Sequence, residues 1–139
     1  MSDRGLTHVA LAVQDVAASV AFYAEFADFR VVHERHDADT GSAVVWLSDL
    51  TRPFVVVLIQ HGETIHPLGG SNHLGVGLPD RREVDRRVAC ARARDCLVSG
   101  PHDAGPPVGY WAILRDPDGH QLELSHGQDV GLTVTHAEG

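Results

Sequence analysis

The strongest constraint on the fold of this chain is an internal repeat. The segment "THVALAVQDVAASV" resembles the later segment "NHLGVGLPDRREVD". When the two are aligned on their histidines, His8 matches His73 and Asp15 matches Asp80, each pair being 65 residues apart. Because a repeat dictates architecture, this one predicts two copies of a single structural module.

Each copy is predicted to begin with a strand that leads into a helix. Asp15 and Asp80 stand where a helix N-cap is preferred, and Glu83 follows Asp80 at capping-box spacing. The helices are predicted over about 15–27 and 81–95, with the arginines of the second helix pointing outward. The residues expected to form the buried stripes of the two helices are Val16, Val20, Tyr23, Ala27, Val84, Val88 and Ala91.

Three strand-like runs follow each helix. They are "RVVHERH", "SAVVWLSD" and "PFVVVLIQ" in the first copy, and "CLVSG", "GYWAILRD" and "HQLELSH" in the second. The sequence therefore predicts an α+β fold made of two βαβββ modules. We expect one domain over 1–139, with modules over about 5–61 and 72–126, a linker over 62–71, and a tail over 127–139 that is loose or packed on a partner subunit.

The first strand of each copy has one bulky face and one nearly empty face, because strand side chains alternate. The bulky faces, which we expect to pack on the helices, carry Val9, Leu11, Val13, Leu74, Val76 and Leu78. The opposite faces carry a histidine followed only by small residues: His8, Ala10 and Ala12 in the first copy, and His73, Gly75 and Gly77 in the second. Such a face leaves space, so we expect a cavity with a histidine in its wall.

One carboxylate joins these histidines. In "RDPDGHQLELS", Leu122 and Leu124 share one strand face, and Glu123 points to the other. Two imidazoles and one carboxylate are the ligand set of a divalent metal site with open positions, suited to Fe, Mn, Zn, Ni or Co rather than Ca. The sequence therefore predicts one divalent transition metal per chain, bound by His8, His73 and Glu123.

Composition excludes several function classes. A net charge of −8 without a basic run argues against a nucleic-acid partner. No apolar stretch reaches membrane-spanning length and no signal-peptide core is present, so we expect a cytoplasmic protein without a membrane partner. Cys90 and Cys96 fit no zinc-finger spacing and are expected to be free thiols. Of the ten histidines, His120 is expected to be structural.

Three segments, "THVALAVQDVAASVAFY", "NHLGVGLPD" and "RDPDGHQLEL", together resemble the vicinal oxygen chelate superfamily over about residues 5–126. This superfamily includes glyoxalase I, methylmalonyl-CoA epimerase, fosfomycin-resistance enzymes, extradiol dioxygenases and bleomycin-resistance proteins. The resemblance implies a cupped, pseudo-symmetric mixed sheet around a metal, with helices on its convex side, in a homodimer. It also implies a small-molecule substrate that chelates the metal through neighbouring oxygens, with His8, His73 and Glu123 as the protein ligands.

Departures from the family pattern narrow the chemistry. Glyoxalase I has a fourth ligand carboxylate where this chain has Val57 or Leu58, and Gln60 would serve only if the strand register slipped. Fosfomycin enzymes have Thr where this chain has Ala10, and use a lysine where this chain contains none. A dioxygenase-like site with three protein ligands is therefore favoured. A glyoxalase- or epimerase-type lyase or isomerase, and a metal-free ligand-binding protein of the bleomycin-resistance type, stay open.

Four further residues complete the predicted site. His61 lies twelve residues before the second predicted ligand and is the acid/base candidate, since an imidazole titrates near neutral pH. Extradiol dioxygenases have a tyrosine where this chain has Ile113, with Tyr110 three positions away on the opposite strand face. The residues expected to contact a substrate are Tyr110, Trp111 and Trp46.

Overall fold

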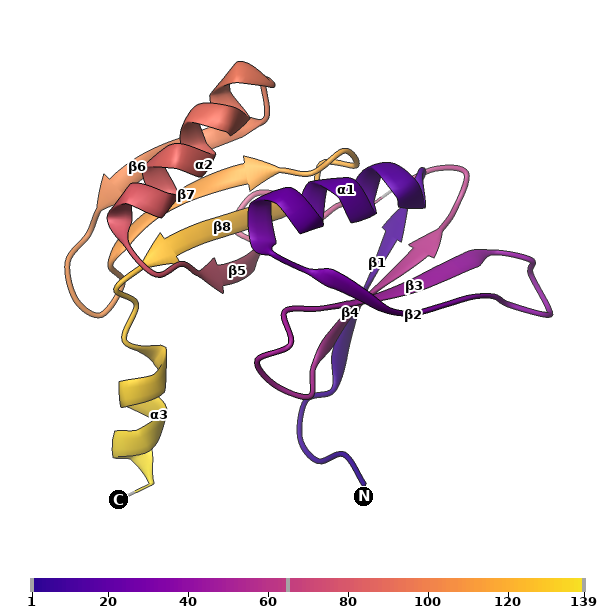
Figure 1. The fold of residues 1–139 in the computed structure, drawn as a ribbon, viewed down its shortest axis with the longest axis horizontal. Helices are drawn as coiled ribbons and strands as arrows, with labels where there is room; N and C mark the ends of the chain where they lie inside the picture. Colours follow the sequence, from indigo (N-terminus) through magenta and orange to yellow (C-terminus); the bar gives the residue numbers. More distant parts are fainter. Residues whose placement is uncertain (1, 65, 139) are drawn as a thin grey trace. The chain divides into compact units, whose positions relative to one another are not determined.

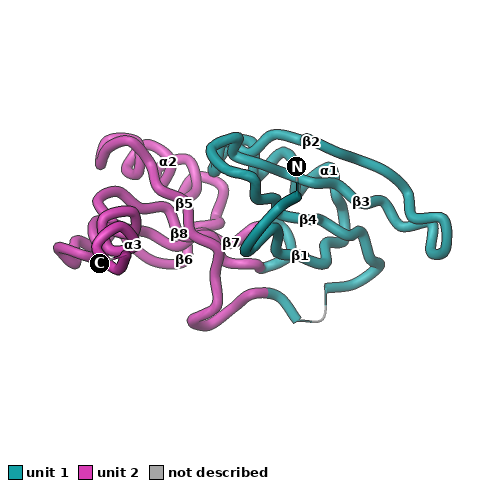
Figure 2. The backbone as a smooth tube through the Cα atoms, turned by 90° about the horizontal axis from the view of Figure 1, so that it is seen from below, with its two compact units in different colours: residues 1–67, 117–119 teal, residues 68–116, 120–139 magenta. Residues whose placement is uncertain are grey.

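The computed structural model describes residues 2–64 and 66–138. The chain forms two compact units, shown in different colours in Figure 2. Unit 1 comprises residues 1–67 and 117–119, and unit 2 comprises residues 68–116 and 120–139. The change from unit 1 to unit 2 after residue 67 falls inside the segment predicted as a linker.

Unit 1 is a βαβββ module (Figure 1). Its elements in chain order are β1 (His8–Val13), α1 (Val16–Ala27), β2 (Arg30–His36), β3 (Ala43–Ser48) and β4 (Val55–Gln60). The sheet order is β1-β4-β3-β2, in which β1 runs parallel to β4 and the other neighbours are antiparallel.

Unit 2 repeats this topology with the sheet order β5-β8-β7-β6. Its elements are β5 (Leu74–Gly77), α2 (Arg81–Ala93), β6 (Leu97–Asp103), β7 (Tyr110–Arg115), β8 (Gln121–His126) and α3 (Val130–Ala137). The predicted α+β fold of two βαβββ modules is confirmed. Residues 130–137 of the predicted tail form a helix, α3, none of whose side chains is buried. The expectation that the tail is loose or packed on a partner subunit stays a prediction.

Both helices begin at the predicted aspartates. The Asp15 carboxylate accepts hydrogen bonds from the backbone N–H groups of Ala17 and Ala18, at 3.1 and 3.2 Å. The Asp80 carboxylate accepts from the Glu83 N–H at 2.8 Å. These bonds satisfy N–H groups that have no partner within the first turn of a helix.

The buried side of α1 differs from the predicted stripe. Tyr23 and Ala27 are buried as expected, whereas Val16 and Val20 are only half-buried. The aromatic rings of Phe22 and Phe26 lie 4.9 Å apart and are both buried. Two large rings bury more apolar area than two valines, so packing rotates the helix toward them.

The buried side of α2 matches the prediction, since Val84, Val88 and Ala91 are almost fully buried. The expectation that the arginines of this helix point outward is wrong for Arg87, which is only 6% exposed. Its guanidinium donates to a Glu83 carboxylate oxygen at 3.0 Å, which compensates for the loss of hydration.

The turn before β8 holds distant segments of the chain through the side chains of Asp118 and His120. The Asp118 carboxylate accepts hydrogen bonds from the Gln14 backbone N–H at 2.9 Å and from the Thr64 hydroxyl at 2.6 Å. His120 is buried, and its Nδ1 accepts from the Leu68 N–H at 2.9 Å, so the prediction of a structural histidine is confirmed.

Candidate metal and substrate site

The first half of the candidate site lies on the sheet of unit 1. β1 pairs with β4 in the register His8 with Val55, Ala10 with Val57 and Ala12 with Ile59. The alternate residues Leu11 and Val13 of β1 are buried, and α1 packs on the neighbouring strands β3 and β4. Since side chains alternate along a strand, His8 and its neighbours occupy the face away from the helix.

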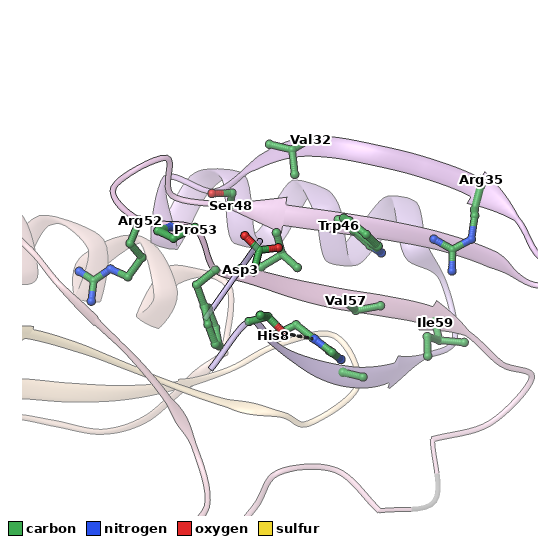
Figure 3. A pocket seen from close by; sticks show the side chains of 14 residues that line it. Asp3, His8, Val32, Arg35, Trp46, Ser48, Arg52, Pro53, Val57 and Ile59 are labelled. Carbon is green, nitrogen blue, oxygen red and sulfur yellow. Dashed lines mark hydrogen bonds between the residues drawn. The ribbon is translucent and has the colours of Figure 1, made fainter. Parts of the chain in front are cut away.

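This face carries a pocket of about 520 Å³ (Figure 3). That size falls in the range of pockets that bind small molecules. Its apolar walls include Trp46, Val55, Val57 and Ile59, and His8 is part of the lining. The sequence-based expectation of a cavity beside a histidine therefore agrees with the structure of unit 1, and Trp46 lies where a substrate contact was expected.

Two arginines bring positive charge to this pocket, although the chain as a whole is acidic. The Arg35 guanidinium lies 5.8 Å from the centre of the Trp46 ring and pairs with Asp37 at 3.1 Å. Arg52 lines the same pocket, and its Nε donates to the neighbouring Thr51 hydroxyl. The pocket thus combines an apolar body with two arginines and one carboxylate, that of Asp3.

The second half of the candidate site lies on the sheet of unit 2. β8 places Glu123 opposite Gly75 on β5, and His73 immediately precedes β5. The His73 Nε2 and Glu123 Oε2 atoms are 4.0 Å apart. Neighbouring ligands on one metal ion, with bonds of about 2.1 Å, are about 3 to 3.5 Å apart. The pair therefore needs to close by less than about 1 Å to share a metal.

A hydrogen bond of the Nδ1 nitrogen orients the imidazole of His73. Nδ1 lies 2.9 Å from the Ser71 carbonyl oxygen, which only accepts hydrogen bonds. Nδ1 must therefore carry the proton, which leaves a lone pair on Nε2 in the neutral ring. In unit 1, the His8 Nδ1 similarly pairs with the Thr7 hydroxyl at 2.9 Å, so Nε2 is again the remaining nitrogen.

Glu123 is only 9% exposed, so its face of β8 does not meet water. Its Oε2 accepts a hydrogen bond from the Gln128 side-chain amide at 3.0 Å. A Cβ atom added to Gly75 would lie 3.4 Å from the same oxygen. The glycine predicted to empty this face thus leaves room directly beside the carboxylate.

Gln121 supports the loop that carries His73. Its side-chain amide donates to the carbonyl oxygens of Gly70 at 2.8 Å and Asn72 at 3.4 Å. This loop includes Ser71, whose carbonyl fixes the tautomer of His73. Sequence reasoning missed both Gln121 and Gln128, because an amide near a predicted ligand gives no signal of its own.

The structure brings two of the three predicted ligands together. His73 and Glu123 belong to unit 2, and His8 belongs to unit 1. Over residues 2–64 and 66–138, no three His, Cys, Asp or Glu side chains form a group that could hold a metal ion. The place of His8 in the same site rests on the sequence repeat.

The register also identifies the position in unit 1 that corresponds to Glu123. Gly75 pairs with Glu123, and the matching residue of β1, Ala10, pairs with Val57. Gln60 accepts a hydrogen bond from the Val16 N–H at 2.9 Å, so it caps α1 on the opposite face. The register slip that would make Gln60 a ligand does not occur.

His61 and His8 lie at opposite ends of the paired strands β1 and β4. The strand partner of His8 is Val55, and His61 comes six residues later, just past the end of β4. Six residues of strand span about 20 Å. The side chain of His61 is exposed, and its acid/base role stays a prediction.

The two aromatic residues of β7 point to opposite faces. The Tyr110 hydroxyl donates to Asp85 on α2 at 2.5 Å, and this bond raises the pKa of Tyr110. Tyr110 thus lies on the helix side of the sheet, away from the face of Glu123, and its substrate contact stays a prediction. Trp111 pairs with Ser125, which by alternation shares the face of Glu123, and its ring lies 4.6 Å from that of His102.

The sequence matches the family model described as the Glyoxalase/Bleomycin resistance protein/Dioxygenase superfamily over residues 5–124. The chain belongs to this superfamily. It is 39% identical over 129 residues to an uncharacterised protein of Pseudomonas aeruginosa, with 91% of each chain covered. It is 27% identical over 128 residues to a probable lactoylglutathione lyase of Vibrio parahaemolyticus, covering 89% of this chain and 91% of that protein.

Solved structures of the superfamily share the fold. Glyoxalase I of Leishmania major aligns with a TM-score of 0.74 and 22% identity, covering 98% of this chain and 95% of that one. The fosfomycin resistance protein FosX of Listeria monocytogenes aligns with a TM-score of 0.72 and 19% identity, covering 91% and 96%. The resemblance to the vicinal oxygen chelate superfamily, inferred from three sequence segments, is thereby confirmed. Among the helices of the described residues, none has the length and apolar character needed to span a bilayer.

Proposed function

We propose that this protein is a divalent-metal-dependent lyase or isomerase that acts on a small molecule. The observation that carries the proposal is the pairing of His73 and Glu123. The His73 Nε2 atom and the buried Glu123 carboxylate lie 4.0 Å apart, and the bond from His73 Nδ1 to the Ser71 carbonyl leaves Nε2 directed at the carboxylate. A glycine beside the carboxylate leaves space for an ion.

The donor set fits a divalent transition metal. Imidazole nitrogen and carboxylate oxygen suit Fe, Mn, Zn, Ni or Co, and His8 is the third ligand that the repeat supplies. When bound, such a metal acts as a Lewis acid that stabilises negative charge on substrate oxygens. FosX of Listeria monocytogenes has been solved with Mn(II), which supports a metal-dependent relative with this fold.

The unit 1 pocket is the proposed site for the body of the substrate. His8, the proposed third metal ligand, is part of its lining. Apolar walls exclude water from the bound molecule, and the guanidinium groups of Arg35 and Arg52 favour a substrate that carries a negative charge. A small anion with an apolar body fits this combination best.

The proposed reaction class follows from the residues that are absent from the metal face. Ring-cleaving chemistry expects an acid/base histidine and a tyrosine near the metal, whereas His61 lies about 20 Å from His8 along the sheet and Tyr110 faces α2. The lactoylglutathione lyases among the relatives support lyase or isomerase chemistry. Because Val57 cannot carry a proton, a proton that leaves the substrate must pass to Glu123 or to solvent.

A dioxygenase remains the second candidate, favoured by the set of three protein ligands. Val57 stands where a fourth ligand would be, which would leave additional positions on the metal open. Oxygen consumption with a panel of catechols, compared with turnover of lactoylglutathione, separates the two reaction classes. Rapid oxygen uptake with a catechol would replace the lyase proposal by the dioxygenase.

Metal content tests the proposal directly. Elemental analysis of protein purified without chelator should give about one divalent metal per chain, and His73→Ala or Glu123→Ala should lose it. His136→Ala in α3 and Glu138→Ala at the C-cap of this helix, both at exposed positions, are matched controls that should keep the metal. A metal-free wild-type protein that still binds aromatic ligands would instead identify a binding protein of the bleomycin-resistance type.

Two further expectations belong to this proposal. The homodimer implied by the family resemblance predicts twice the chain mass in light scattering. The cytoplasmic location predicted from the sequence is checked by fractionating cells that express the native protein.

A further inference from the structure

Gln128 lies between β8 and α3, directly beside the proposed metal carboxylate. Its side-chain Nε2 donates to Glu123 Oε2 at 3.0 Å. An ionised carboxylate only accepts hydrogen bonds, so the amide must present its N–H to it. The same oxygen, Oε2, is the one that faces His73 Nε2 at 4.0 Å.

The backbone around Gln128 is anchored, so its side chain is held by the fold. Asp129 N–H donates to the Pro107 carbonyl at 3.0 Å. Gly127, which precedes Gln128, has a φ of 84°. It packs closely against Gly109: a Cβ atom added to Gly109 would lie only 2.8 Å from the carbonyl carbon of Gly127. Residues before and after Gln128 are thus fixed to the segment that precedes β7.

We propose that Gln128 is a positioning residue that orients the Glu123 carboxylate toward His73 for metal binding. This inference rests on the proposed metal-dependent function. A carboxylate oxygen has two lone pairs, so Oε2 can keep the amide bond while the carboxylate binds a metal. Without the amide, the carboxyl group rotates freely about its terminal torsion, which is broad and weakly restrained.

The expected effect is on metal affinity. Loss of an outer hydrogen bond to a metal ligand costs roughly 10- to 100-fold in affinity. Gln128→Leu removes the donor at similar size, and Gln128→Met is a second variant that keeps the unbranched shape. Gln14→Leu is the matched control, because Gln14 is exposed and uses its backbone N–H, rather than its side chain, to contact Asp118.

The experiment titrates Co²⁺ into metal-free wild-type protein and the three variants, and records thermal melting of each metal-free protein. Both Gln128 variants should bind Co²⁺ roughly 10- to 100-fold more weakly than wild type. Their metal-free melting temperatures should equal that of wild type, and Gln14→Leu should match wild type in both measurements. In NMR spectra of metal-free protein, Glu123→Ala should shift the Gln128 side-chain amide signal.

Four results would overturn the inference. Wild-type Co²⁺ affinity in the Gln128 variants would remove the positioning role alone and leave the proposed function standing. A fall in both affinity and metal-free melting temperature would assign Gln128 a structural role. An unmoved Gln128 amide signal in Glu123→Ala would deny the contact. A wild-type protein that binds no Co²⁺ would overturn the proposed function and this role together.

Discussion

Replacing Asp118 by alanine should destabilise the protein through unit 1, although Asp118 lies in a turn far along the chain. Its carboxylate accepts the Gln14 N–H at 2.9 Å and the Thr64 hydroxyl at 2.6 Å. Hydrogen bonds to charged groups contribute about 1.5–3 kcal/mol each. Gln14 is exposed and Thr64 is half-buried, so water can replace part of each bond. We therefore expect a loss of about 1 kcal/mol per bond, or about 2 kcal/mol in total.

Urea denaturation followed by circular dichroism measures this loss, and the denaturant slope should stay unchanged. Asp118→Asn keeps a carbonyl acceptor but loses the charge, so its cost should be about half. Asp39→Ala is the control for the change of net charge at an exposed turn residue, and it should stay within about 0.5 kcal/mol of wild type. An Asp118→Ala protein as stable as Asp39→Ala would refute the reasoning.

Three further outcomes are expected. Hydrogen bonds from two arginines of α2, Arg86 and Arg87, lower the pKa of Glu83 from 4.5 to about 2. The ionised Glu83 should therefore contribute its full share of the folding free energy above about pH 4.5 and lose it as the pH falls toward 2. The difference in unfolding free energy between wild type and Glu83→Gln, measured as a function of pH, checks this. Gly75→Val should weaken Co²⁺ binding at least about tenfold by crowding the neighbouring carboxylate, whereas Gly77→Val, with nothing within 4 Å of an added Cβ, should not. Arg52→Ala should raise the KM for an anionic substrate roughly tenfold and change kcat little. As the control, an uncharged analogue of that substrate should have the same KM with wild type and with Arg52→Ala.

The fold was predictable because its signals are local or repetitive. Asp15 and Asp80 marked the helix starts, since an N-cap preference depends on the residue and its next turn. The 65-residue repeat then supplied the topology, since two matched segments must fold alike. The details that escaped prediction depend on packing. On α1, Phe22 rather than Val20 is buried. On α2, Arg87 can be buried because it donates a hydrogen bond to Glu83, one turn earlier in the helix.

The site was predictable only as far as strand alternation reaches. Alternation correctly separated Glu123 from its leucine neighbours and His8 from the helix face. Alternation could not show which residues of neighbouring strands lie opposite one another, because that depends on the register between the strands. The sequence therefore did not reveal that His61 lies about 20 Å along the sheet from His8. The amides of Gln121 and Gln128 escaped because their partners are fixed by tertiary structure.

The comparison of the two units explains how one topology yields two different half-sites. Ala10 with Val57 in unit 1 and Gly75 with Glu123 in unit 2 are the same register position. In unit 1 both side chains are apolar, and the face becomes the wall of a pocket of about 520 Å³. In unit 2 the space left by glycine accommodates a buried carboxylate, whose lost hydration is partly offset by the Gln128 amide. The difference between alanine and glycine opposite this position thus accompanies the difference between an apolar pocket wall in unit 1 and a buried carboxylate in unit 2, which are the proposed substrate wall and the proposed metal ligand.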